Sequence, residues 1–253
     1  MARVVAVIPA RLGSTRFPAK VLASATGWPL IRHVVENARR ARSLERVVVA
    51  TDDSSVEAAV LAFGGECVMT RADHPNGTSR LHEASQSLGL APDDVVVNVQ
   101  GDEPEMEPSV IEAAVQAMLA DGARNKHVPV VTVATPFLPG EDASNPNIVK
   151  VVLGLDGRAL YFSRSLIPHV RSGADAAASP LRHVGLYVYR AGFLATYVTL
   201  SPTPLERSEM LEQLRVLEHG HEIRCVVGEC RGMGIDTAEQ YEAFVNRWKN
   251  GNS

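Results

Sequence analysis

The chain has 253 residues, a length that suits one large α/β domain or two small ones. We expect a single domain spanning 1–253. Apolar residues make up 45% of the chain and charged residues 21%, an ordinary composition for a soluble globular protein. The net charge of −4 gives no general reason to bind nucleic acid or an anionic membrane. Neither is expected as a partner, and an anion site must come from a local cluster of cations.

The N-terminal sequence MARVVAVIPA has an apolar part too short for a signal peptide. No stretch approaches the ~18 apolar residues that a membrane span needs. The three cysteines, Cys67, Cys225 and Cys230, have no metal-ligand spacing, and such sparse usage favours a reducing compartment. We therefore expect a cytoplasmic protein without membrane insertion.

Three apolar runs in the first half are typical of strands buried on both faces: 3–9, 46–53 and 93–104. Helical spacing of apolar residues lies between them, over 29–42 and 55–65. Alternation of strand and helix predicts βαβ units and a parallel sheet. Ligands bind beyond the carboxyl ends of such strands, so the loops PARLGSTR, ATDD and VQGDEP should converge on one face.

After about residue 125 the pattern changes to strand-like runs, over 127–136, 148–164 and 182–190. The sequence LDGRA carries an Asp-Gly turn that indicates a hairpin. We expect an antiparallel insert over about 126–200, with a mobile loop at 171–180.

Helical spacing returns over 204–220 and 236–248. The first of these segments should direct one set of apolar residues inward: Leu205, Met210, Leu211, Leu214 and Leu217.

The opening loop, in VIPARLGSTRFPAK (7–20), places Arg11, Arg16 and Lys20 around a Gly-Ser-Thr turn. Backbone N–H groups and hydroxyls of such a turn can bind an anion, and the cations can contact phosphate oxygens. The loop is neither a Walker A motif nor GxGxxG. A phosphate site and a solvated basic turn both remain open.

Two acidic stretches are candidate Mg²⁺ ligands. Gln100, Asp102 and Glu103 follow a buried strand, and a carboxylate there can hold Mg²⁺ against a nucleotide; a turn acid or helix N-cap is the alternative. Asp236 precedes a helix, so locally an N-cap is favoured, and metal binding follows only if its segment lies beside Asp102.

The stretch HPNGTSRLHEA (74–84) contains an Asn-Gly turn followed by the start of a helix. Arg80 falls in the first helical turn, where the helix dipole disfavours a cation. This position indicates either an anionic partner or an Arg whose head lies in water. The histidines lack metal-ligand spacing.

Seven motifs occur in order along nearly the whole chain: IPARLGSTRFPAK, HPNGTSRLHEA, VNVQGDEP, NPNIVKVV with GRALYFSRSLIP, RHVGLYVYRAGF, PLERSEMLEQLRVLEHG and GIDTAEQY. Together they resemble the 3-deoxy-manno-octulosonate cytidylyltransferase (CMP-Kdo synthetase) family. The resemblance implies transfer of CMP from CTP to the acidic sugar Kdo, with release of pyrophosphate, in lipopolysaccharide biosynthesis. It also implies a sheet of the nucleotide-diphospho-sugar transferase type, Mg²⁺ as cofactor, and a homodimer that the insert helps to form.

The same resemblance implies roles for individual residues. Those implied in catalysis are Arg11, Lys20, Asp102 and Asp236, with Asp102 and Asp236 as Mg²⁺ ligands. Those implied in CTP binding are Ala10, Arg11, Leu12, Ser14, Lys20, Pro75, Asn76, Gly77, Thr78 and Arg80. Those implied around the sugar are Gln100, Arg164, His183, Tyr187, Glu212 and Gln213. A cation such as Arg164 suits the sugar carboxylate, and the other side chains suit its hydroxyls.

The chain departs from the family pattern at two points. It has GLYVYR, with Val188, where GIYGYR is usual, and NGTSR, with Ser79, where SGTER is usual. Both departures bear on the sugar accepted, so 8-amino-Kdo or a sialic acid is the alternative substrate. A nucleotide-binding module without turnover is a further alternative. The number of Mg²⁺ ions stays open, as does the proton acceptor, either Asp102 or a metal-bound hydroxide.

Overall fold

The computed structural model describes residues 2–13, 16–123, 128–171 and 179–251. Ser14 and most of the loop predicted to be mobile lie outside these ranges. The strands are β1 (Val4–Ala10), β2 (Arg46–Thr51), β3 (Glu66–Met69), β4 (Val95–Asn98), β5 (Val130–Pro136), β6 (Lys150–Leu153), β7 (Ala159–Ser163), β8 (Leu181–Arg190) and β9 (Ile223–Val227). The helices are η1 (Lys20–Leu22), α1 (Leu30–Ala38), α2 (Ser54–Ala62), α3 (Gly77–Ser87), α4 (Pro108–Ala123), α5 (Ala191–Tyr197), α6 (Pro204–Glu209), α7 (Gln213–Glu218) and α8 (Ala238–Gly251).

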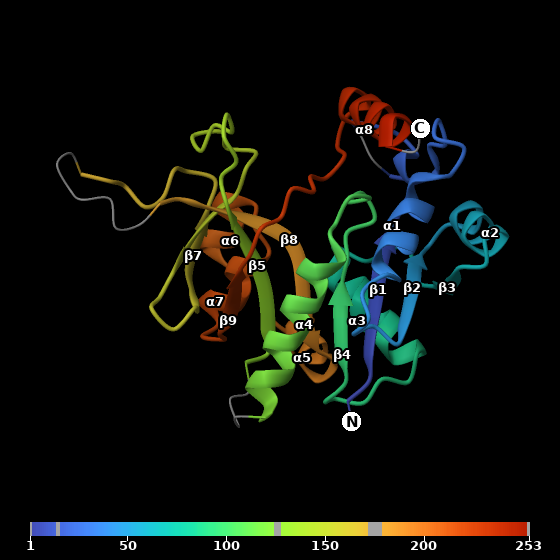
Figure 1. Cartoon of the computed structure of the whole chain (residues 1–253). Helices are drawn as coiled ribbons and strands as arrows, with labels where there is room; N and C mark the ends of the chain where they lie inside the picture. Colours follow the sequence, from blue (N-terminus) through green and yellow to red (C-terminus); the bar gives the residue numbers. More distant parts are fainter. Residues whose placement is uncertain (1, 14–15, 124–127, 172–178, 252–253) are drawn as a thin grey trace.

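Nine strands of the described residues form one sheet (Figure 1). Seven of them lie side by side in the order β3-β2-β1-β4-β8-β5-β9. The first four strands run parallel, which confirms the predicted βαβ units. Ala10 pairs with Thr51, and Val7 pairs with Asn98. The carboxyl ends of β1, β2 and β4 therefore lie at one edge, and the loops after them start side by side.

The alternation of side chains along β1 explains its continuous apolar sequence. Val4, Ala6 and Ile8 belong to a core on one face, packed against α1, α2 and α4. Val5 and Val7 belong to a core on the other face, packed against α3, α5 and α7. Since both faces of the strand are buried, no position on it favours a polar residue.

The antiparallel strands are part of the same sheet rather than a separate layer. β8 runs antiparallel between β4 and β5, and β9 then pairs parallel with β5. Only the hairpin of β6 and β7 extends off this path, joined to β8 through β6. The predicted Asp-Gly turn is present in that hairpin, where Gly157 has a φ of 80°. The expected insert over 126–200 thus shares its core with the parallel half.

The helical segment over 204–220 is broken, contrary to the prediction of one helix. Met210 adopts a left-handed conformation, with φ 53°, between α6 and α7. The break turns Leu205 and Met210 outward, 40% and 76% exposed, so the prediction that they face the core is wrong. Leu211 and Leu214 are buried as expected.

Helix α8 lies beside α1, far from β9 in the view of Figure 1. Residues of both helices form a third core, which includes Leu30, Tyr241 and Phe244. The chain between β9 and α8 therefore passes across the carboxyl edge of the sheet and brings Asp236 to it. Within the ranges given above, no helix combines the length and hydrophobicity needed to cross a membrane.

Candidate active site

Lys20 joins three distant segments of the chain. Its ammonium donates to Asp102 Oδ2 at 2.6 Å, to the backbone oxygen of Ile235 at 2.8 Å and to Asp236 Oδ1 at 3.3 Å. Arg16 forms an ion pair of 3.0 Å with the other carboxylate oxygen of Asp236. The basic turn and the two predicted aspartates therefore meet at one place.

Asp236 does not cap the following helix, so the N-cap interpretation is wrong. The hydroxyl of Thr237 accepts a hydrogen bond from the backbone N–H of Gln240, which is the capping contact. The carboxylate of Asp236 instead faces the two cations of the opening loop. Its segment therefore lies beside Asp102, which is the condition stated above for metal binding.

Asp102 is held by close backbone packing at the end of β4. A Cβ atom on Gly101 would lie 2.8 Å from the backbone oxygen of Pro9, a distance that real Cβ atoms do not show. Glycine at 101 lets the loop after β4 approach the end of β1 closely. Asp102 thus comes within reach of Lys20.

These residues border an open space of about 470 Å³, called here the charged cavity. Its cations Arg11, Arg16 and Lys20 and its carboxylate Asp102 follow strands at the carboxyl edge, as predicted from the strand ends. Arg80 is contributed by helix α3. The lining residues of the charged cavity are Pro9, Ala10, Arg11, Gly13, Arg16, Lys20, Val21, His74, Asn76, Gly77, Arg80, Gln100, Gly101, Asp102, Glu212 and Asp236.

Asp102 and Asp236 fit a Mg²⁺ ion as a donor set. Their carboxylates already share one cation, the ammonium of Lys20. Mg²⁺ in nucleotide sites usually takes one or two carboxylates and fills its shell with phosphate oxygens and water. No group of three or more His, Cys, Asp or Glu side chains forms a ready metal cluster in the described part of the chain. The pair therefore suits an ion that arrives with a phosphate ligand.

Glu103 lies behind this pair and differs from it in charge. Burial, and next the negative charge of Asp102, raise the pKa of Glu103 to about 8. Its Oε2 atom is buried without a hydrogen-bond partner among the described residues. Glu103 is therefore mostly neutral at pH 7 and adds no third negative charge beside Asp102 and Asp236.

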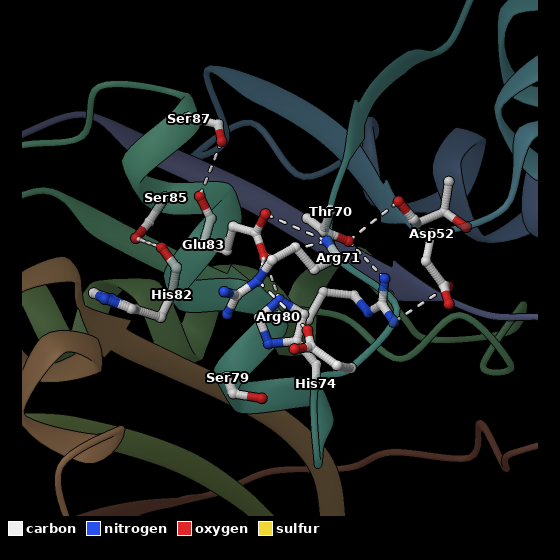
Figure 2. Close-up of polar contacts among 12 residues, drawn as sticks. Asp52, Thr70, Arg71, His74, Ser79, Arg80, His82, Glu83, Ser85 and Ser87 are labelled. Atoms are coloured by element: carbon white, nitrogen blue, oxygen red, sulfur yellow. Dashed lines mark hydrogen bonds and ion pairs between the residues drawn. The ribbon is translucent and has the colours of Figure 1, made fainter.

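Helix α3 begins at the opposite wall of the charged cavity. Asn76 caps it, since its Oδ1 accepts from the backbone N–H of Ser79 at 2.9 Å. The ring of His74 contacts the carboxylate of Glu83 in the second turn of the helix, as Figure 2 shows. The loop before α3 is thereby fixed against the helix that follows it.

Arg80 is buried, so the interpretation of an Arg with its head in water is wrong. It is 5% exposed, and its guanidinium lies 3.2 Å from Asp52 and donates to Thr70 at 2.5 Å (Figure 2). The unfavourable helix position is offset by a carboxylate from the loop after β2. Sequence reasoning noted the ATDD loop but assigned Asp52 no partner.

A second space, of about 190 Å³, adjoins the first and is called here the tyrosine cavity. Gly77, Gln100 and Glu212 line both. No Lys, Arg or His is among the described residues that line it. Its other lining residues are Thr78, Asn98, Val130, Tyr187, Tyr189, Tyr197, Met210, Leu211, Gln213, Val216 and Ile223.

The polar groups of the tyrosine cavity suit the hydroxyl groups of a ligand. Burial raises the pKa of Tyr187 well above its usual value, so its hydroxyl stays protonated. Burial also raises the pKa of Glu212. Asn98 Oδ1 is buried without a hydrogen-bond partner among the described residues, which leaves an acceptor for a ligand hydroxyl.

The remaining candidate residues lie at varied distances from the two cavities. Ala10, Thr78, Tyr187 and Gln213 line one of them. Gln100, which lines both, donates to the backbone oxygen of Gly185 at 3.1 Å. Four other candidates line neither cavity: Leu12, Pro75, Arg164 and His183.

Arg164 is engaged with backbone carbonyls. Its guanidinium donates to Glu209 at 2.6 Å, Pro146 at 3.1 Å and Met210 at 3.4 Å. Two of these carbonyls belong to the break between α6 and α7. In this structure Arg164 therefore supports the turn that precedes Glu212 and Gln213.

His183 lies on β8 next to the ring of Tyr187, with ring centroids 5.4 Å apart. Its Nε2 lies 2.9 Å from Thr132 Oγ1, whose hydroxyl donates to the backbone oxygen of Leu186 at 2.8 Å. Thr132 can then only accept from His183, so Nε2 carries the proton. Burial lowers the pKa of His183 to about 3, which keeps the ring neutral.

Sequence reasoning missed Asn98, Tyr189 and Tyr197, which line the tyrosine cavity, and Asp52, which lines neither cavity but pairs with Arg80. Asn98 and Tyr189 lie on strands, where one polar position among apolar ones is the signal available. Tyr197 ends α5, a helix that sequence reasoning did not predict. The position of Tyr197 in the sequence gave no indication of a functional role.

A parallel sheet that gathers cations and paired carboxylates at its carboxyl edge defines a nucleotide-binding α/β protein. Residues 5–223 match the family model described as cytidylyltransferase, and the chain belongs to this family.

Relatives of known name agree with this family. A 3-deoxy-manno-octulosonate cytidylyltransferase of Syntrophobacter fumaroxidans is 51% identical over 243 residues, 96% of each chain. One of Syntrophotalea carbinolica is 49% identical over 93% of this chain and 94% of that protein. The structure of a CMP:2-keto-3-deoxy-manno-octonic acid synthetase complexed with CTP has a TM-score of 0.91 and 40% identity, and covers 99% of this chain and 100% of that one.

Proposed function

We propose that this protein transfers CMP from CTP to the anomeric hydroxyl of 3-deoxy-manno-octulosonate, giving CMP-Kdo and pyrophosphate for lipopolysaccharide biosynthesis. Relatives at about half identity carry that activity in their names. The observation that carries the proposal is the contact of Lys20 with both Asp102 and Asp236, in a cavity that adjoins a second one without Lys, Arg or His among its described lining residues.

The charged cavity takes the triphosphate in this proposal. Arg11, Arg16 and Lys20 offset the charge of the phosphates and of the departing pyrophosphate, and catalysis consists mainly of positioning and electrostatic stabilisation. The bond from the sugar oxygen to the α-phosphorus forms as the bridge to the β-phosphate breaks. Pyrophosphate leaves with the bonding electrons, and the hydroxyl releases one proton.

The hydroxylated part of the sugar occupies the tyrosine cavity, and its anomeric carbon with the attached carboxylate lies at the junction with the charged cavity. Gln100 and Glu212 stand at that junction and offer a donor and an acceptor. Mg²⁺ held by Asp102 and Asp236 would supply charge neutralisation on the phosphates. Lys20 keeps the two carboxylates together for this purpose.

Pyrophosphate release with CTP, Mg²⁺ and a panel of 2-keto acid sugars tests the proposal. We expect Kdo to be preferred over 8-amino-Kdo and sialic acid. The Asp102→Ala variant should lose at least about 10²-fold in rate, whereas Asp93→Ala, an exposed aspartate outside both cavities, should not change it. Turnover of sialic acid in preference to Kdo would overturn the substrate, and full activity of Asp102→Ala would overturn the carboxylate's role.

We also propose a homodimer formed through the hairpin of β6 and β7 and the segment after it. Four large apolar side chains are exposed there: Leu155, Leu160, Leu166 and Val170. Exposed apolar side chains gathered in one region favour an interface. Sedimentation of the parent and of Leu160→Asp tests this, and a monomeric parent would contradict it.

We propose a cytoplasmic location, because CTP is supplied there. The three cysteines are free thiols, as expected in a reducing compartment. Fractionation of cells that express the full chain tests this location.

A further inference from the structure

The hydroxyl of Tyr197 connects the two cavities. It accepts a hydrogen bond from Asn76 Nδ2 at 3.3 Å and donates one to Glu212 Oε2 at 3.3 Å. Asn76 lines the charged cavity, Tyr197 lines the tyrosine cavity, and Glu212 lines both. A single buried hydroxyl, on a residue that is 2% exposed, therefore lies between a nucleotide-side and a sugar-side residue.

The direction of this hydrogen-bond chain is determined by its ends. The amide nitrogen of Asn76 can only donate, and a carboxylate can only accept. The orientation of the amide is set independently, because Asn76 Oδ1 accepts from the backbone N–H of Ser79 at 2.9 Å. Tyr197 must therefore act as acceptor and donor at once, which no apolar ring can do.

The hydrogen bonds described so far leave one carboxylate oxygen of Glu212, Oε1, available to a ligand. Oε2 accepts from Tyr197 and, at 3.4 Å, from the hydroxyl of Thr78. No described residue donates a hydrogen bond to Oε1. A ligand hydroxyl in the cavity would thus meet Oε1, with the carboxylate plane held by the two donors on Oε2.

The ring of Tyr197 is itself held in place. The guanidinium of Arg215 lies 5.1 Å from the ring centroid and forms two hydrogen bonds with Glu206, at 2.8 and 2.5 Å. The ring packs in the core between α5, α3 and α7. Because the ring of Tyr197 is already ordered, its hydroxyl is presented without a further cost in conformational entropy when a ligand binds.

We propose that Tyr197 is a positioning residue that couples nucleotide and sugar binding. Its hydroxyl joins Asn76 to the Glu212 carboxylate, so a nucleotide that contacts Asn76 in the charged cavity favours the carboxylate position that the sugar needs. By linkage, the sugar must raise nucleotide affinity by the same factor. This inference rests on the proposed function, because it takes the two cavities as the nucleotide and sugar sites.

Calorimetric titration of parent, Tyr197→Phe and Glu212→Gln tests this coupling, with α,β-methylene-CTP and Mg²⁺ to prevent turnover. We expect Kdo to bind the parent more tightly when the nucleotide analogue is present. In Tyr197→Phe this enhancement should fall by about tenfold, the effect of losing one hydrogen bond to a charged acceptor. Nucleotide affinity without sugar should stay within about twofold, since Ser79 still orients Asn76.

Two further comparisons separate positioning from general loosening of the fold. Tyr161→Phe loses a 3.4 Å hydrogen bond to Glu209 outside both cavities and should keep the parent's coupling. The double variant Tyr197→Phe/Glu212→Gln should bind Kdo no more weakly than Glu212→Gln, because both changes act on one carboxylate. Glu212→Gln leaves the buried phenol intact and should by itself reduce the coupling, so it carries the test if Tyr197→Phe does not fold.

Unchanged coupling in Tyr197→Phe, or additive losses in the double variant, would overturn the inference. A parent that binds both ligands without any mutual enhancement would also overturn it. A parent that binds and turns over no Kdo at all would instead overturn the proposed function. The two failures therefore give different results.

Discussion

The two adjoining cavities are built in opposite ways. The charged cavity places Lys20 and Arg16 against Asp102 and Asp236, all on loops that follow strands or precede a helix. The tyrosine cavity has no Lys, Arg or His among its described lining residues and is walled by strands and packed helices. The first presents several ionic charges, and the second presents mainly hydroxyls and amides, with the Glu212 carboxyl at the junction. A reaction between a triphosphate and a sugar needs both, since the charged part is stabilised by ions and the hydroxylated part by directional hydrogen bonds.

The difference also appears in how each cavity holds its shape. Ion pairs and the close approach at Gly101 hold the charged cavity. The tyrosine cavity depends on core packing and on a turn supported by Arg164. Substitutions should therefore affect the two cavities in separable ways.

The largest effect is expected from Lys20→Met, which removes the cation shared by Asp102 and Asp236. Without it the two carboxylates repel each other, and we expect kcat/KM to fall by about 10³-fold. Pyrophosphate release measures this, with Lys249→Met, an exposed lysine outside both cavities, as the matched control. A loss of less than about tenfold would show that the ionic contacts are not what distinguishes the charged cavity.

Gly101→Ala should break the backbone packing behind the same cavity. The new methyl group would lie 2.8 Å from the backbone oxygen of Pro9, so β1 and the loop after β4 must separate. We expect the free energy of unfolding to drop by about 3 kcal/mol, measured by urea denaturation. Gly228→Ala is the control, because its methyl group would meet no atom within 4 Å. Equal stability of the two variants would contradict the close approach.

The burial behind the tyrosine cavity can be tested through His183, which does not line the cavity but packs beside Tyr187. Its pKa is lowered from 6.5 to about 3 by burial, so the unfolded state binds a proton that the folded state does not. The contribution of His183 to stability is present above pH 6.5 and is lost as the pH falls toward 3. Between pH 7 and pH 4 we expect His183→Gln to lose less unfolding free energy than the parent, by on the order of 2 kcal/mol.

Chemical denaturation across that pH range measures the difference in slope. His219→Gln, at an exposed histidine at the end of α7, serves as control and should follow the parent. Parallel pH curves for parent and His183→Gln would show that folding does not lower the pKa of the ring, against its burial beside Tyr187.

The smallest effect is expected at Arg164, where charge and geometry can be separated. Its guanidinium donates to three carbonyls, so Arg164→Ala should raise the KM for the sugar about tenfold by loosening the turn before Glu212, with the KM for CTP unchanged. Arg164→Lys should behave like Arg164→Ala, because lysine cannot reproduce the fork of donors. Arg42→Ala, at an exposed site, is the control. Recovery of the parent KM by lysine would instead mean that Arg164 acts on the sugar through its charge.

The sequence alone determined the parallel half of the sheet and most of the charged cavity. Continuous Val-rich runs identified β1, β2 and β4, and polar residues placed at the carboxyl ends of parallel strands must share an edge. The pattern of strands and loops therefore assigns Arg11, Lys20 and Asp102 to one place. The resemblance to a family added Asp236, which local patterns had favoured as an N-cap.

Only the tertiary structure decided the rest, because it depends on contacts between residues far apart in the chain. The break at Met210 has no local signal, and the position of Arg80 indicated an anionic partner without identifying Asp52. The position of Tyr197 between Asn76 and Glu212, at separations of 121 and 15 residues, has no local signal either. Local patterns report which face of an element is buried. They do not report which polar side chains of other elements contact that face. The tyrosine cavity is formed by such contacts between distant elements.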